Sequence, residues 1–202
     1  MRGGRGKPGR PPIARAETNI KPKVLLVLRE NSSDLGYMLR TEVGVMVAML
    51  EAAGLAVVTA SESGRPMGEG VSKIKPELKL SDVRMADYVG LLLPSLAVGL
   101  VVPVPAKLIK ILRRAVALEI PVAAQHGSVV VLQRSGVLKK KKYAFERPVF
   151  GEGEYAGTGV VRDGKLITSG TCPHLARETG RPDGTETLIR LFVEAVSEGG
   201  HK

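Results

Sequence analysis

The order of apolar and polar positions along the chain predicts strands that alternate with helices. Four short, continuously apolar segments, at residues 23–28, 55–61, 87–94 and 120–125, have the length and composition of buried strands. Elsewhere, apolar residues recur with helical spacing between capping residues and glycines. The predicted helices run from Ser33 or Asp34 to Gly54 and over residues 105–119, 127–136 and 184–199, and residues 143–170 are expected to form a hairpin-like β region.

Strands that are apolar throughout and separated by helices indicate a mostly parallel sheet with helices on both faces. The expected fold class is therefore α/β, doubly wound and flavodoxin-like. In such sheets, ligands bind beyond the carboxyl ends of the strands, where the strand order reverses. The loops after residues 28, 93 and 125 are expected to converge on that place.

The N-terminal segment differs in composition from the rest of the chain. Residues 1–23 contain seven Lys and Arg side chains and one acid, and so carry most of the net charge of +10. The segment is rich in Gly, Pro and Arg and has no apolar periodicity, which predicts a disordered basic tail over residues 1–22. Residues 23–199 are expected to form a single α/β domain. A solvated extension is the simplest interpretation of the tail, although weak, non-specific contact with nucleic-acid phosphates is an alternative.

Composition excludes several classes of protein. No apolar run has the roughly 20 residues of a membrane-spanning helix, and the N-terminus lacks a secretory signal, so a cytoplasmic protein is expected. A single cysteine excludes a disulfide framework within the chain. Few Asn and Gln residues together with many charges suggest a thermophilic source. The glycine-rich stretch at 151–159 lacks the order of a dinucleotide-binding loop, so no cofactor is expected.

Residues 123–127, "AAQHG", lie where the fourth apolar segment ends and the next helix begins. Many enzymes place their nucleophile at such a turn, which exposes a side chain beside a helix N-terminus. Here the turn contains Gln125, His126 and Gly127. A glutamine amide is not a nucleophile and cannot be activated by a neighbouring base. The turn has the architecture of a nucleophile site without its usual chemistry.

Six segments of the chain resemble the PfpI/ThiJ superfamily in their order and spacing, over roughly residues 23–198. They are KVLLVL, EAAGLAVVTAS, DYVGLLLP, IPVAAQHG, SGVLK and RDGKLITSG. This superfamily includes intracellular peptidases, deglycases and chaperone-like proteins, and it is related to the class I glutamine amidotransferases. The resemblance implies a flavodoxin-like fold and, because members often form dimers or larger rings, a homo-oligomer.

The resemblance also implies which positions form the site. In the family a nucleophilic Cys stands on a strained turn at the end of the fourth strand, which places Gln125 at the nucleophile position, followed by His126 and Gly127. The family's Gly-Gly after the third strand corresponds to Pro94-Ser95-Leu96. Ser95 is then expected to offer a backbone N–H to a ligand, with Leu96 crowding the mouth of the pocket.

The family's acid on the first helix corresponds to Glu42, twelve residues before Gly54. A helical projection places Glu42 between Met38 and Met46, inside the apolar arc. A carboxylate on an inward face needs a partner, or else it stays protonated. The amide NH₂ of Gln125 is the partner expected from the sequence.

The segment 169–180, "SGTCPHLARETG", contains the only cysteine, Cys172, and also His174. In the family the corresponding loop borders the nucleophile, so Cys172 and His126 are candidates for a relocated nucleophile and base. His174 is the weaker candidate for the base, because side chains two residues apart rarely meet on a regular element. Glu42, His126, Cys172 and His174 are suitable ligand types for a metal but have no recognised spacing, so no metal is expected.

Two functions from different classes follow from the sequence. The first is a non-catalytic or strongly diverged family member that binds a small metabolite or a partner in the retained pocket, with Ser95, Gly127 and His174 as the expected ligand-binding positions. The second is a cysteine-dependent hydrolase of peptidase, deglycase or amidase type that uses Cys172 with His126. The distance between the Cys172 sulfur and His126 distinguishes the two functions, because a distance beyond hydrogen-bond reach eliminates the hydrolase.

Overall fold

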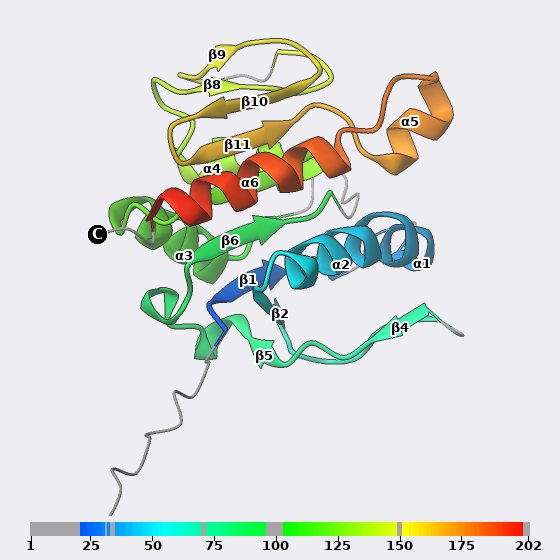
Figure 1. Ribbon diagram of the computed structural model, residues 1–202, viewed down its shortest axis with the longest axis vertical. Helices are drawn as coiled ribbons and strands as arrows, with labels where there is room; N and C mark the ends of the chain where they lie inside the picture. The colour runs from blue at the N-terminus through cyan, green and yellow to red at the C-terminus, as the bar shows by residue number, and fades with distance from the viewer. Residues whose placement is uncertain are drawn as a thin grey trace, which may run out of the picture.

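The computed structural model (Figure 1) describes residues 21–30, 32, 35–69, 72–95, 103–148 and 151–199. Most of the predicted basic tail, the N-cap candidates Ser33 and Asp34, and Leu96 lie outside the described residues.

The described residues form one large sheet with the strand order β10-β11-β7-β6-β1-β2-β5. All neighbouring strands run parallel except β10 and β11, which form an antiparallel hairpin. The strands of this sheet are β1 (Lys23–Val27), β2 (Ala56–Ser61), β5 (Leu78–Lys79), β6 (Gly90–Leu93), β7 (Val122–Gln125), β10 (Val160–Asp163) and β11 (Leu166–Ser169). Two small pairs lie outside it: β3 (Met67–Glu69) with β4 (Ser72–Ile74), and β8 (Lys142–Tyr143) with β9 (Glu154–Tyr155). The strand order reverses between β1 and β6, as in doubly wound sheets.

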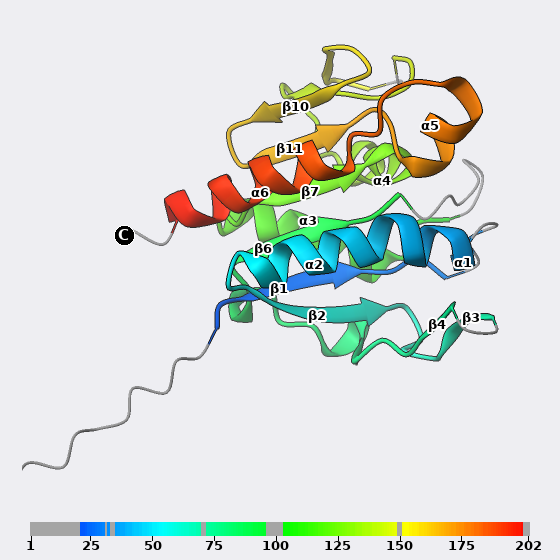
Figure 2. The ribbon, with the colours of Figure 1, turned by 45° about the vertical axis from the view of Figure 1, so that its right-hand side comes forward.

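Helices cover both faces of the sheet (Figure 2). The helical elements are α1 (Leu35–Met38), the π-helical turn η1 (Leu39–Val43), α2 (Gly44–Ala52), η2 (Leu80–Asp82), η3 (Met85–Asp87), α3 (Ala106–Ala117), η4 (His126–Ser128), α4 (Val129–Ser135), α5 (Pro173–Thr179) and α6 (Thr185–Gly199). Helices α2 and α6 pack on one face, and α3 and α4 pack on the other. The predicted α/β doubly wound, mostly parallel fold is therefore confirmed.

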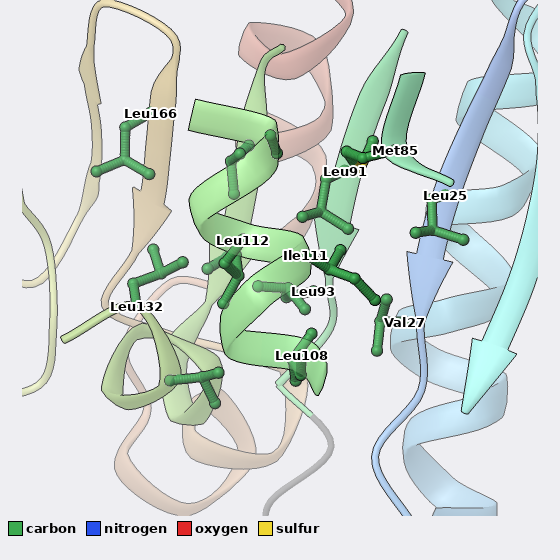
Figure 3. Packing of buried hydrophobic residues seen from close by; sticks show 14 of the residues in the cluster. Leu25, Val27, Met85, Leu91, Leu93, Leu108, Ile111, Leu112, Leu132 and Leu166 are labelled. Atoms are coloured by element: carbon green, nitrogen blue, oxygen red, sulfur yellow. The ribbon is translucent and has the colours of Figure 1, made fainter. Parts of the chain in front are cut away.

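The alternation of side chains along β1 shows how the core is divided between the two faces. Leu25 and Val27 belong to the apolar cluster under α3 and α4, which Figure 3 shows, whereas Val24, Leu26 and Leu28 belong to the cluster under α2 and α6. Successive strand residues point to opposite faces, so a strand that is buried on both faces must be apolar throughout. The continuous apolar runs in the sequence result from this double burial.

The predicted elements match the structure in their order. The four predicted strands correspond to β1, β2, β6 and β7, and the predicted first helix is the continuous helical stretch α1–η1–α2. The predicted hairpin region contains β10 and β11, which turn at Gly164 with φ of 63°. Elements not predicted are β3 to β5, η2 and η3 between β2 and β6, and α5 in the segment treated as a loop. None of the described helices is long and apolar enough to cross a membrane.

Candidate functional site

The candidate site lies beyond the carboxyl ends of β6, β7 and β11. Ser95 follows β6, Gln125 ends β7, and Cys172 follows β11 and precedes α5. Strands β6 and β7 are parallel neighbours, and so are β7 and β11, so their carboxyl ends meet at one edge of the sheet. The loops after β6 and β7 therefore converge there, together with the segment after β11.

The strained residue of the turn after β7 is His126, which has φ of 38°. Gln125 has φ of −104° and ψ of 132°, which is ordinary extended backbone, and its side chain is fully buried. A positive φ is uncommon for a residue with a Cβ and marks the sharp part of a strand-to-helix turn. His126 therefore has the strained backbone of the turn and Gln125 is the last residue of the strand, while the assignment of Gln125 to the family's nucleophile position stays a prediction.

Gln125 is the centre of a buried hydrogen-bond network that ties three segments together. Its Nε2 donates to the carbonyl oxygen of Thr171 at 3.0 Å and to Oγ1 of Thr185 at 2.7 Å, and it lies 3.4 Å from Oδ1 of Asp183. The predicted hydrogen bond from Gln125 to Glu42 is wrong. Gln125 pairs in register with Ser169 of β11, so its side chain reaches the segment after β11 and the start of α6 instead.

Glu42 is fully buried on η1, as its place in the apolar arc predicts. Its Oε1 accepts a hydrogen bond from the backbone N–H of Ser95 at 2.6 Å. A carboxylate inside a protein needs such a donor, because burial without one is costly. The N–H of Ser95, which we expected to face a ligand, thus binds Glu42 and holds the end of β6 against the helix.

Cys172 lies at the N-cap of α5 and is 1% exposed. Its Sγ is 3.6 Å from Nδ1 of His126, within hydrogen-bond range for sulfur. Burial raises the pKa of the Cys172 thiol, and so does the charge on Glu42. Hydrogen bonds from the backbone at Leu175 and His174 and from the Ser95 side chain lower this pKa and offset part of the rise. The thiol is therefore protonated at neutral pH, and it needs a base before it can act as a nucleophile.

His126 links Cys172 to a third residue. Its ring stacks on Phe145 with a centroid distance of 5.4 Å, and its Nε2 lies 3.6 Å from Oε2 of Glu146. Burial lowers the pKa of His126, although Glu146 offsets part of this effect. The imidazole is thus neutral at neutral pH. When its proton is on Nε2, which faces Glu146, its Nδ1 is free to accept the thiol proton of Cys172.

Glu146 is the site residue that the sequence did not reveal. It lies in the loop after β8, twenty residues from His126 along the chain, and it is 29% exposed. No spacing rule joins these two positions, because the path of that loop alone brings them together. The nearest signal in the sequence is that Glu146 directly follows an aromatic residue, Phe145.

The two remaining candidates, His174 and Gly127, have structural partners. Nε2 of His174 lies 3.0 Å from Oε1 of Glu178, one turn further along α5. A Cβ on Gly127 would lie 3.3 Å from the carbonyl oxygen of Ser95, so the close approach of the two loops favours glycine there. Within the part of the chain that the structure describes, no group of three or more His, Cys, Asp or Glu side chains is placed to hold a metal ion.

Comparison with known proteins gives a match over most of the chain. The model of the DJ-1/PfpI family matches residues 22–178. No curated protein sequence matches. Similar solved structures include a ThiJ/PfpI domain protein from Brachyspira murdochii, with a TM-score of 0.66, 13% identity, and coverage of 88% of this chain and 98% of that one.

Two further structures have the same architecture. DJ-1beta from Drosophila melanogaster has a TM-score of 0.59 and 22% identity, with coverage of 89% of this chain and 97% of that one. A DJ-1 superfamily protein from Agrobacterium tumefaciens has a TM-score of 0.58 and 19% identity, with coverage of 86% and 98% respectively. At these identities the structures establish the fold and leave the chemistry to the residues of the site.

Proposed function

Because the chain belongs to the DJ-1/PfpI family, we propose that it is a cysteine-dependent hydrolase in which Cys172, after β11, is the nucleophile and His126, at the turn after β7, is the general base. The observation that carries this proposal is the distance of 3.6 Å between Sγ of Cys172 and Nδ1 of His126. A distance beyond hydrogen-bond reach would have eliminated the pair.

The proposed chemistry begins with proton transfer. Neutral His126 accepts the thiol proton of Cys172 through Nδ1, and the resulting imidazolium is stabilised by the carboxylate of Glu146 beside Nε2. The thiolate then adds to the carbonyl carbon of an ester or amide substrate. For an ester or amide, His126 returns the proton to the leaving group, and water hydrolyses the acyl-thiol intermediate. A base is essential here, because burial raises the pKa of this thiol.

Turnover of a panel of ester, peptide and glyoxal substrates, before and after alkylation of the thiol, tests the proposal. The chain has one cysteine, so the modification is specific to Cys172. Alkylation and Cys172→Ala are expected to abolish turnover, and His126→Asn to reduce it by about 10²–10⁴-fold, the usual contribution of a general base. His174→Asn is the matched control, because His174 pairs along α5 with Glu178. Turnover that survives alkylation would exclude Cys172 as nucleophile.

A second candidate function is binding without catalysis, and it is favoured by the hydrogen bond that the backbone N–H of Ser95 already makes. Its backbone N–H donates to Glu42 and therefore does not face a reacting carbonyl. Under this alternative the pocket holds a small metabolite. Native mass spectrometry of the purified protein tests it, because a retained small molecule and the oligomeric state appear in the same spectrum. A retained molecule, together with no turnover on any substrate, would favour binding over hydrolysis.

A further inference from the structure

Arg29 is a buried charge without a partner in the described structure. It lies two residues after the end of β1, the residue is 8% exposed, and its guanidinium nitrogens keep some contact with solvent. Among the described residues, no group accepts a hydrogen bond from its guanidinium or forms an ion pair with it. Arginine is almost never buried this deeply unless it is paired, because an uncompensated charge in a protein interior is costly. A guanidinium that is unpaired among the described residues and has so little contact with solvent therefore points to an anion that is not part of the described chain.

Arg29 lines a hollow of about 50 Å³ at the carboxyl end of β1. The apolar part of the wall comes from β1, the start of α3 and η2, and consists of Val27, Leu28, Leu80, Pro103, Pro105 and Leu108. Val27 points toward α3 from β1 (Figure 3). A volume of this size holds one or two water molecules or one small charged group, since a water occupies about 30 Å³ in the liquid. The hollow thus fits the head of an anion, with the rest of a larger molecule in solvent.

The N-terminus of α3 reaches the same hollow. The first hydrogen bond within this helix runs from the N–H of Ile109 to the carbonyl of Pro105 at 3.2 Å, so the N–H groups of residues 106–108 have no acceptor within the helix. The first turn contains no acid, and it includes Lys107. A helix of twelve residues has a partial positive charge at this end, which favours an anion. Arg134 on α4 adds to the positive potential at Arg29 and lowers the pKa of Arg29, although burial is the larger cause.

Two acids also line the hollow, and neither neutralises Arg29. Oε1 of Glu30 accepts hydrogen bonds from the hydroxyl of Ser61 at 2.7 Å and from the N–H and hydroxyl of Ser63 at 2.7 and 2.8 Å, which hold it toward the loop after β2. Glu62 is exposed at the rim. These carboxylates place a limit on the total negative charge that the hollow tolerates, and so they favour a single small oxyanion group.

We propose that this hollow binds a small oxyanion, such as a phosphate or carboxylate group, between the guanidinium of Arg29 and the N-terminus of α3. The guanidinium supplies two parallel N–H donors and the helix supplies backbone N–H groups, an arrangement that suits both anions. The hollow lies on the α3–α4 face of the sheet, whereas Cys172 packs in the cluster under α2 and α6. This anion site is therefore separate from the proposed nucleophile and does not depend on it.

Calorimetric titration of the full-length protein with sodium phosphate and with sodium acetate tests the proposal, with sodium chloride added to equalise the ionic strength. The wild-type protein is expected to bind at least one of the two anions, and the pair of titrations tells a phosphate site from a carboxylate site. Arg29→Met is expected to weaken that binding by about tenfold to a hundredfold, the usual loss when a charge-assisted hydrogen bond is removed. Arg190→Met, which removes an exposed charge from α6, is expected to bind as the wild type does.

A second variant keeps the test decisive if Arg29→Met does not fold. Arg29→Lys keeps the charge but loses the two parallel donors, so it is expected to bind the anion more weakly than the wild type. Absence of binding to both anions in the wild type overturns the proposal. Binding by Arg29→Met or Arg29→Lys that equals the wild type overturns it as well.

Discussion

Replacement of Gln125 by methionine tests the role of this residue as the centre of a buried network. Methionine has nearly the same length and shape but donates no hydrogen bond, so the change removes the bonds to Thr171 and Thr185, at 3.0 and 2.7 Å. Each such bond contributes about 0.5–1.5 kcal/mol net, which gives a loss of about 1–3 kcal/mol in the free energy of unfolding. For a chain of this size, a loss near the middle of that range corresponds to a fall in Tm of roughly 4–8 °C.

Urea unfolding of the wild type and of Gln125→Met measures the loss directly, and Gln133→Met is the matched control. Gln133 is half-buried on α4 and forms no hydrogen bond with the described residues, so its replacement is expected to change the free energy of unfolding by about 0.5 kcal/mol or less. Equal stabilities for the two variants would show that the hydrogen bonds of Gln125 contribute nothing measurable to the free energy of unfolding. The same variant is expected to speed alkylation of Cys172, since the residue before it loses its tie to Gln125.

Three further predictions concern pH, the thiol and a glycine. Burial lowers the pKa of His126, so the unfolded chain binds this proton at a higher pH than the folded chain does. The free energy of unfolding is therefore expected to fall as the pH drops below about 6.5. Urea titrations at several pH values measure this fall, which His126→Gln is expected to reduce. Because burial raises the pKa of Cys172, iodoacetamide at neutral pH is expected to alkylate the folded protein more slowly than the urea-unfolded protein, and equal rates would contradict this. A Cβ on Gly170 would lie 2.6 Å from the carbonyl oxygen of Thr158, whereas one on Gly159 would meet open space. Gly170→Ala is therefore expected to lower the free energy of unfolding by about 1–3 kcal/mol and Gly159→Ala to change it little, which calorimetry can measure.

The fold could be predicted from the sequence because its strands are buried on both faces. That burial requires continuous apolar runs, and such runs separated by helical periodicity have few alternative arrangements. Short elements were harder to predict. Helix α5 has only seven residues, too few for a periodic pattern, although Pro173 at its start and Gly180 after its end are typical boundary residues.

The site was predicted less completely, for two physical reasons. Glu42 could be found because a carboxylate inside an apolar helical arc is unusual, and its burial shows in the local pattern. The residues alone do not show which of Gln125 and His126 has the positive φ, and in the structure it is His126. Glu146 and the partner of Glu42 depend on how distant loops meet, and no spacing along the chain encodes that.

Intact-protein mass spectrometry after incubation with an activated acyl ester is the most direct test of the pair formed by Cys172 and His126. The wild type is expected to gain one acyl group on Cys172, Cys172→Ala to gain none, and His126→Asn to gain it far more slowly, because the protonated thiol then lacks its base. If the wild type gains no acyl group on Cys172, or if His126→Asn is labelled as fast as the wild type, the relocated nucleophile and base are contradicted.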